Sequence, residues 1–383
     1  MRADHFPRCH RWLLCQMRYP LNLFFVCLLL MTFALYRYQS GQRCRYRDNQ
    51  TSQGKFPLRS ITSGSVNKTR LNRTVDQPTV VVLSLLHNSE PSLEDFKFLV
   101  ETLTYPHELI SVVFGEDGSK DGTVLKAKQV LSSLTSEFRR VDFHHFDLGG
   151  QYPWDLPIGG DPKHRASVQK ERRRHLALAR NMLLTNGLGD EDWVLWIDSD
   201  IIKTPPDIIE QMLATKKDIV APRCMYKPNK DEELLYDRNT WQDTDASRKY
   251  KADPGILFLE GYNGERPPKL NMDQLKDRGV DLVEVDSVGG CVLLIKAIHH
   301  QQGLVFPPYI YKHYIETEGL SKIAQAMGLK LWAMPRLTVY HYHSGTDPAF
   351  YKRNAVRSQQ RFGMNGIDMQ KAIKLIFLQK SRT

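Results

Sequence analysis

Most of this sequence alternates short, continuous apolar runs with longer amphipathic segments. Runs such as Thr79–Leu86 (TVVVLSLL) and Trp193–Ile197 (WVLWI) contain few polar residues, which is typical of strands buried on both faces of a sheet. Segments such as Ser92–Thr104 and Lys170–Leu184 carry apolar residues at helical spacing. This alternation predicts an α/β domain over residues 78–345 with a mixed, mostly parallel sheet. In such a sheet, ligands bind beyond the carboxyl ends of the strands.

The same two patterns predict the remaining elements of the domain and a helical extension over residues 346–383. Strands are expected at Ile110–Phe114, Val141–Phe146, Ile219–Ala221, Val292–Ile295 and Leu337–His343. Helices are expected at Asp121–Leu131 and Glu318–Met327.

The charge distribution argues against nucleic acid as a partner. The chain has a formal net charge of +10, and residues 1–77 alone contain 13 Lys or Arg and three Asp or Glu. The rest of the chain is therefore balanced in charge. A folded domain without net positive charge is a poor candidate for binding a phosphate backbone.

The N-terminal segment has the pattern of a membrane anchor. Residues 19–36 form an uncharged, mainly apolar stretch that is long enough for a membrane-spanning helix. We expect a cytosolic tail at residues 1–18, a transmembrane signal anchor at residues 19–37 and a stem at residues 38–77. The alternative is a cleaved signal peptide, since Thr32 and Ala34 offer small residues at a plausible cleavage spacing, but 20 preceding residues are many for that.

Three glycosylation sequons indicate on which side of the membrane the main domain lies. Asn49, Asn67 and Asn72 each begin an Asn-X-Thr triplet within the polar stem. Glycosylation there would place the domain in the lumen, as in a single-pass type II protein of the secretory pathway. Of the cysteines in that compartment, Cys44, Cys224 and Cys291, at least one is free or pairs with another chain.

An acidic pair gives the strongest chemical signal. Asp198 and Asp200 directly follow the apolar run Trp193–Ile197, and side chains two residues apart in an extended chain point to the same side. Two carboxylates at one point repel each other unless a cation lies between them. A hard divalent cation suits carboxylate oxygens and commonly bridges to substrate phosphates. The alternative is a solvated loop.

Two further segments are candidates for binding a nucleotide donor. The loop after Ile110–Phe114 contains Asp117 and Gly118, where a carboxylate can accept hydrogen bonds from ribose or base. The alternative is an ordinary strand-to-helix turn. In the helix Lys170–Leu184, Arg180 and Asn181 lie amid apolar residues, and an arginine there could pair with a diphosphate. Arg172 and Arg174, by contrast, are expected to face solvent.

Three other motifs also lie where a site is expected. His341 and His343 fall on one face of the last predicted strand, which favours metal coordination over a structural role. Glu316 and Glu318 are candidates for contact with an acceptor hydroxyl or for general-base work, or they stabilise a helix N-terminus. The pair Gly289–Gly290 would let the backbone approach a ligand, or it forms a turn before a strand.

In this order, the motifs resemble those of glycosyltransferase family 62 over residues 79–344. These are fungal Golgi α-mannosyltransferases with the GT-A fold that build the α-1,6-linked mannan backbone. The matching stretches are EDGSKDGT (116–123), ARNMLL (179–184), WVLWIDSDI (193–201), YDRNTW (236–241), DSVGGCVLLIKA (286–297), FPPYIYKHYIETEGLSKIAQAMG (306–328) and YHYHS (340–344).

The resemblance implies a retaining transfer of mannose from GDP-mannose to a glycan acceptor, with Mn²⁺ or another divalent cation. It implies that Asp198, Asp200 and His341 bind the metal and that Asp117 lies in the nucleotide-binding turn. It also implies a Golgi membrane protein that assembles with itself or with related transferases. Two alternatives remain: a non-catalytic subunit of a mannosyltransferase complex, or a GT-A transferase that uses a UDP-sugar.

Overall fold

The computed structural model describes residues 77–148, 166–229, 231–259 and 268–342. The predicted tail, anchor, C-terminal extension and His343 lie outside the described residues. Of the predicted stem only Gln77 is described, so the three sequons also lie outside. Among the helices that are described, none is both long and apolar enough to cross a membrane.

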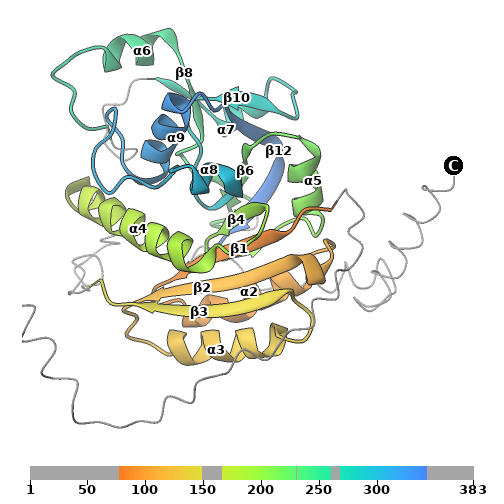
Figure 1. Cartoon of the computed structure of the whole chain (residues 1–383). Helices are drawn as coiled ribbons and strands as arrows, with labels where there is room; N and C mark the ends of the chain where they lie inside the picture. Colours follow the sequence, from red (N-terminus) through yellow and green to blue (C-terminus); the bar gives the residue numbers. More distant parts are fainter. Residues whose placement is uncertain (1–76, 149–165, 230, 260–267, 343–383) are drawn as a thin grey trace, which may run out of the picture. The chain divides into compact units, whose positions relative to one another are not determined.

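The domain is built on a mixed sheet with the strand order β10-β12-β6-β11-β4-β1-β2-β3 (Figure 1). The strands on this path are β1 (Val80–Leu86), β2 (Ile110–Asp117), β3 (Arg140–Phe146), β4 (Trp193–Ile197), β6 (Ile219–Tyr226), β10 (Val283–Val285), β11 (Val292–Lys296) and β12 (Leu331–His341). Short strands β5 (Ile201–Lys203) and β7 (Leu234–Leu235) pair with β12 and β6, and β8 (Trp241–Asp243) pairs with β9 (Lys269–Asn271).

Four of the seven neighbouring pairs along this strand order are parallel, in keeping with the predicted mixed, mostly parallel sheet. Strands β3, β2, β1 and β4 are all parallel. Strand β11 then lies antiparallel to both β4 and β6, whereas β6 and β12 are parallel to each other. The sheet is therefore mixed, as predicted, and β11 joins its two parallel parts.

Helices cover both faces of the sheet. One hydrophobic cluster contains Phe96 of α2 (Leu93–Glu101), Val130 of α3 (Thr123–Leu134) and Met212 of α5 (Ile208–Ala214). The other contains Leu183 of α4 (Ala166–Gly187) and Leu320 of α9 (Glu316–Ala326). The remaining short helices are η1 (Glu90–Ser92), η2 (His107–Leu109), α6 (Asp245–Lys251), α7 (Met272–Lys276) and α8 (Ala297–Gln301).

Two predicted boundaries were wrong in ways that bear on the site. Strand β2 continues beyond Phe114 to Asp117, because residues of the expected turn remain paired with β3, for example Glu116 with His145. Strand β12 begins at Leu331 rather than Leu337, and its pairing with β6 shifts register between Met334 and Thr338. The register shift lets the strand continue through the intervening residues to His341.

Candidate functional site

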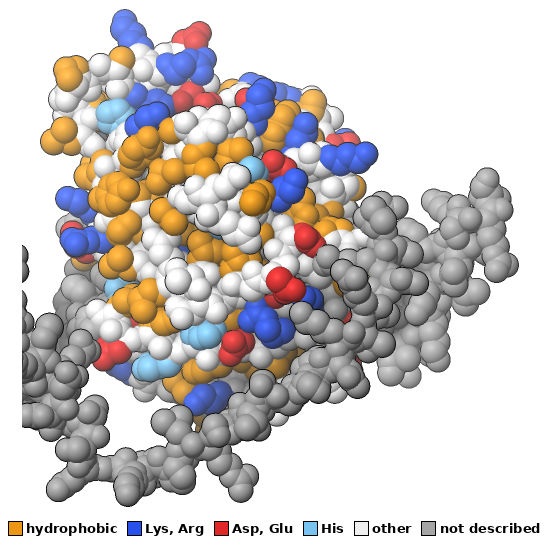
Figure 2. Space-filling view, viewed as in Figure 1, with side chains coloured by type: hydrophobic (Ala, Val, Ile, Leu, Met, Phe, Trp, Pro, Cys, Tyr) orange, Lys and Arg blue, Asp and Glu red, His pale blue; other side chains and the backbone are white. Residues whose placement is uncertain are grey.

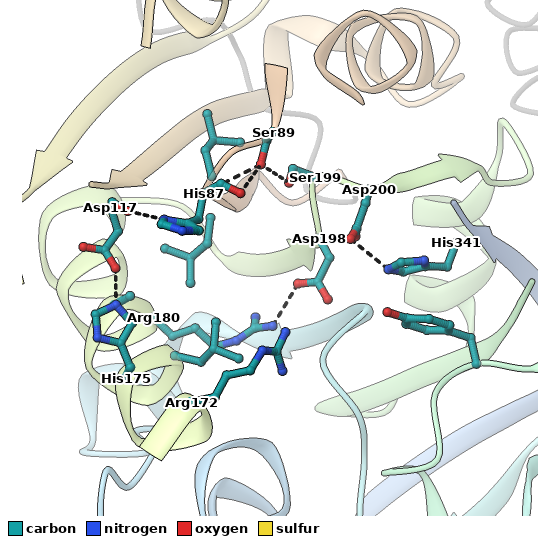
Figure 3. Close-up of a pocket in the computed structure, with 15 residues that line it drawn as sticks. His87, Ser89, Asp117, Arg172, His175, Arg180, Asp198, Ser199, Asp200 and His341 are labelled. Carbon is teal, nitrogen blue, oxygen red and sulfur yellow. Dashed lines mark hydrogen bonds and ion pairs between the residues drawn. The ribbon is translucent and has the colours of Figure 1, made fainter. Parts of the chain in front are cut away.

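A pocket lies at the carboxyl ends of β1, β2, β4 and β12, where the sequence predicted a ligand (Figure 3). The face of α4 that lines it carries residues at positions i, i+3, i+4, i+7 and i+8, from Arg172 to Arg180. The polar and aromatic residues that line the pocket are His87, Ser89, Asp117, Arg172, His175, Arg180, Asp198, Ser199, Asp200, Tyr236 and His341.

The acidic pair enters the pocket through a turn rather than an extended segment. The amide of Asp198 donates to the carbonyl of Cys291, and the amide of Ile201 donates back to the carbonyl of Asp198, at 2.9 and 3.0 Å. The two carboxylates consequently contact different partners. Asp198 Oδ1 accepts a hydrogen bond from Arg180 at 2.8 Å, while Asp200 Oδ2 lies 2.9 Å from His341 Nε2.

His341 is held by several contacts at the end of β12. Its ring stacks on that of Tyr236 with the centroids 3.5 Å apart, and the amide of Tyr342 donates to the carbonyl of Asp200 at 2.8 Å. Burial lowers the pKa of His341, but the Asp200 carboxylate and its hydrogen bond outweigh burial and raise it overall. The end of β12 is thereby tied to the acidic turn by both backbone and side chain.

The surroundings of the Asp198 carboxyl disfavour its charged form. Burial raises its pKa to about 7, Arg180 opposes that rise, and the nearby Asp200 carboxylate adds to it. A cation between the two carboxylates would relieve this repulsion. Carboxylate oxygens with one imidazole form a ligand set that Mn²⁺ accepts, so these residues fit a divalent metal by their chemistry. Within the described residues, however, no three His, Cys, Asp or Glu side chains are grouped closely enough to hold an ion.

Arg180 is a buried link between several groups. Besides Asp198, its guanidinium pairs with Glu316 Oε1 at 3.1 Å. Its guanidinium carbon lies 5.2 and 5.4 Å from the ring centroids of Trp196 and Phe306, which form an edge-to-face pair beside it. These contacts occupy the guanidinium with protein partners.

Glu316 and Glu318 belong to a layer of ion pairs between α4 and α9 and are absent from the pocket lining. Arg173 Nη1 lies 3.4 Å from Glu318 Oε2 and 4.0 Å from Glu316 Oε2. Glu318 Oε1 also accepts a hydrogen bond from the indole of Trp241 at 2.8 Å. The two arginines seven residues apart on α4 therefore face the two acids at the start of α9.

The paired glycines make room for protein side chains. A Cβ on Gly289 would lie 1.6 Å from Asp237 Oδ2, and one on Gly290 would lie 2.8 Å from Arg180 Nη2. Asp237, to which the sequence analysis gave no role, is buried, and burial raises its pKa to about 6 despite a hydrogen bond from the Asn239 amide. Neither glycine lines the pocket.

The donor-binding residues proposed from the sequence divide into two groups. Asp117 lines the pocket, where its carboxylate pairs with His175 of α4 and its carbonyl oxygen lies 2.6 Å from His87 Nδ1. Gly118, with φ of 61°, and Asn181 do not line it. The Asn181 side chain instead forms two hydrogen bonds, of 2.7 and 2.9 Å, with the backbone of Phe306.

The prediction that Arg172 faces solvent was wrong. Arg172 lines the pocket, and Figure 3 shows its guanidinium pointing toward the acidic pair. No ion pair or hydrogen bond joins it to another described residue. Arg174 is exposed and 3.9 Å from Glu171, as expected of a solvent-facing side chain. Four further lining residues were not predicted from the sequence: His87, Ser89, His175 and Tyr236. The helical spacing of Arg172 and His175 with Arg180 would have indicated that these three residues share a face of the helix.

The surface agrees with the balanced charge of the domain. On the face drawn in Figure 2, described Lys and Arg side chains are interspersed with Asp and Glu. Hydrophobic side chains are also exposed on this face. The view gives no support to a nucleic-acid-binding surface on this side.

Comparisons with known proteins place the chain in a family. Residues 61–310 match the Anp1 family. The chain is 32% identical over 258 residues to the mannan polymerase complex subunit mnn9 of Schizosaccharomyces pombe, an alignment covering 65% of this chain and 76% of that protein. It is 28% identical over 356 residues to the subunit MNN9 of Candida albicans, covering 85% and 96%. A solved mannosyltransferase from Pyrobaculum calidifontis, in complex with GDP-Man and Mn²⁺, is 13% identical at a TM-score of 0.42 over 78% of this chain and 65% of that one. The family match and the alignment with mnn9 together show that the chain belongs to the Anp1 family.

Proposed function

We propose that this protein is a metal-dependent, retaining glycosyltransferase of the GT-A fold and of family 62, which moves mannose from GDP-mannose to a glycan acceptor. The observation that carries the proposal is the composition of one pocket. The pocket is lined by Asp117, Asp198, Asp200, His341 and Arg172, whose guanidinium has no partner among the described residues. The names of the relatives, subunits of mannan polymerase complexes, favour mannose as the sugar.

Asp198, Asp200 and His341 would hold the cation, which we propose to be Mn²⁺. When bound, such an ion neutralises negative charge on a leaving diphosphate. For Asp200 and His341 to act as ligands, the 2.9 Å contact between them would have to open. Arg180, which also lines the pocket, already neutralises part of the charge on Asp198.

Arg172 replaces Arg180 as the proposed partner of the diphosphate. The Arg180 guanidinium is occupied by Asp198 and Glu316, whereas that of Arg172 points into the pocket with no partner among the described residues. A guanidinium can donate two parallel hydrogen bonds to phosphate oxygens. Asp117 and His175 would then meet the ribose or base.

The transfer itself would need no protein nucleophile. We propose that the acceptor hydroxyl attacks the anomeric carbon on the face from which the diphosphate leaves, so that configuration is retained. The carbon–oxygen bond to the acceptor forms as the bond to the diphosphate breaks, and the hydroxyl proton passes to a leaving phosphate oxygen. Glu316 and Glu318, which are buried outside the pocket lining, take no part in this step.

Ligand-induced thermal shifts test the donor. GDP-mannose with Mn²⁺ should raise the melting temperature of the full chain, and UDP-sugars should not, because a ligand that binds only the folded state stabilises it. A shift with UDP-sugars alone would instead support the UDP-sugar alternative. If neither nucleotide gave a shift, with or without Mn²⁺, the donor site as described would be wrong.

Substitution of Asp200 tests the chemistry. Asp200→Ala should abolish transfer from GDP-mannose while leaving the melting temperature near that of the wild type, since this side chain is 44% exposed. Asp207→Ala, which changes an exposed aspartate outside the pocket, serves as the control and should retain activity. Normal turnover by Asp200→Ala in saturating Mn²⁺ would remove Asp200 from the mechanism.

Substitution of Arg172 tests the diphosphate contact. Arg172→Met should raise the KM for GDP-mannose by about tenfold or more, because a charged hydrogen bond worth about 1.5–3 kcal/mol is lost. Arg174→Met, two residues along the same helix but exposed, should leave KM unchanged. Equal effects of the two substitutions would contradict the assignment.

The second candidate function is that of a non-catalytic subunit, and the names of the relatives favour it too. Each of the two relatives is named as a subunit of a complex. Hydrolysis of GDP-mannose by the purified chain alone, without a partner, would decide between them.

We further propose that the protein is a single-pass type II Golgi membrane protein, anchored by residues 19–37 and glycosylated at Asn49, Asn67 and Asn72. Glycosidase digestion and protease protection in sealed vesicles test this arrangement.

A further inference from the structure

Glu316 is held in an unusual backbone conformation at the start of α9. Its φ is 58°, in the left-handed region that residues other than glycine rarely adopt. Its side chain is only 4% exposed. The amide donates to the carbonyl of Pro307 at 3.1 Å, and Oε2 accepts a hydrogen bond from the Thr317 hydroxyl at 2.7 Å. Oε1 lies 3.1 Å from Arg180 Nε as an ion pair, and this Nε has no hydrogen-bond partner among the described residues.

The Arg180 guanidinium in turn has little freedom to move. It packs against the edge-to-face rings of Trp196 and Phe306, and the missing Cβ of Gly290 leaves room for its Nη2. Glu316 pairs with its Nε, and Nη2 donates to Asp198 Oδ1 at 2.8 Å. One guanidinium therefore bridges a buried carboxylate behind the pocket and a carboxylate inside it.

We propose that Glu316 is a positioning residue, whose carboxylate fixes the Arg180 guanidinium so that it orients the Asp198 carboxylate in the pocket. This role differs from direct contact with an acceptor, because Glu316 reaches the site only through Arg180. The functional part of this inference rests on the proposed function. The structural part, a charge bridge from Glu316 to Asp198, does not.

Glu318 provides the matched comparison. It lies two residues away in the first turn of the same helix and is also buried, but its partners are Arg173, Trp241 and Lys269. Arg173 lies 4.0 Å from Glu316, farther than the 3.1 Å between Arg180 and Glu316. Glu318→Gln should therefore affect stability without disturbing Asp198.

A double-mutant cycle tests the bridge by whether Glu316→Gln lowers or raises the melting temperature. With Arg180 present, Glu316→Gln removes an ion pair and should lower the melting temperature. With Arg180→Met, the buried Glu316 and the partly exposed Asp198 become like charges without a bridge, and Glu316→Gln should then raise it. An effect of the same sign in both backgrounds would overturn the inference. If Arg180→Met does not fold alone but folds when combined with Glu316→Gln, the sign has reversed as expected.

A binding measurement tests the consequence for the site. Calorimetric titration of Mn²⁺ into the full chain with GDP should show affinity falling about tenfold or more in Glu316→Gln and in Arg180→Lys, since lysine lacks the planar fork. Glu318→Gln should retain wild-type affinity. Equal loss in both glutamate variants would overturn the positioning role. If the wild type binds neither Mn²⁺ nor GDP, the proposed function fails, while the melting-temperature cycle still decides the bridge.

Discussion

Asp237 offers a direct measure of the electrostatic cost built into this site. Its carboxyl is buried, and burial raises its pKa from 3.8 to about 6, although the Asn239 amide donates to it at 2.8 Å. The nearby Glu316 carboxylate also raises it. We expect Asp237→Asn to stabilise the protein at neutral pH, because the amide is neutral and can still accept the Asn239 hydrogen bond.

The magnitude follows from the pKa shift. A shift of about two units corresponds to at most about 3 kcal/mol of destabilisation when the carboxyl is ionised. Because the folded-state pKa lies above the unfolded value, the folded state binds the proton more tightly, and stability falls as pH rises from about 4 through about 6. The advantage of Asp237→Asn should thus be complete at pH 7.5, about half as large at pH 5 and nearly absent at pH 4.

Thermal melts of metal-free protein between pH 5 and pH 7.5 provide the assay. The full effect corresponds to a gain of roughly 6–12 °C for a domain of this size, as an upper limit. Asp281→Asn, which changes a carboxylate that is 82% exposed, serves as the control and should show little pH-dependent difference. A gain for Asp237→Asn that does not change with pH, or no gain at all, would refute the electrostatic reasoning.

Two further predictions follow from close contacts. Gly289→Ala should strongly destabilise the protein, because its Cβ would lie 1.6 Å from Asp237 Oδ2, and Asp237→Ala in the same chain should recover most of the melting temperature. No recovery would mean that the clash is elsewhere. Tyr236→Leu should lower transfer by roughly two- to tenfold, since the stack on His341 is worth about 0.5–1.5 kcal/mol, whereas Tyr236→Phe should retain it. Equal losses would show that the hydroxyl, and not the ring, matters.

The central strands could be predicted from the sequence because their signal is local. Trp193–Ile197 was predicted with the same bounds as β4, since a continuous apolar run between polar residues leaves little choice. Strands of two or three residues, such as β7 and β10, carry too few residues for a pattern. The antiparallel direction of β11 also depends on tertiary packing, which no run of apolar residues encodes.

Among the residues proposed from the sequence, those at strand ends line the pocket more often than those on helices. Asp198 and Asp117 line the pocket because the end of a strand fixes where the next side chains lie. On α4, by contrast, the helical period shows which arginines share a face but not which face packs against the rest of the protein. Only the packing of the helix buries Arg173 and directs Arg172 into the pocket.

The arginines of α4 differ in their partners. Arg173 and Arg180, seven residues apart, face the acids at the start of α9, so their charges are balanced within the protein. A ligand that displaced either arginine would leave a buried carboxylate unpaired, which costs several kcal/mol. Arg172 forms no ion pair with a described residue. A diphosphate can therefore pair with Arg172 without breaking the layer of ion pairs that keeps α4 and α9 together, and this is the physical reason to assign donor recognition to Arg172 and orientation of Asp198 to Arg180.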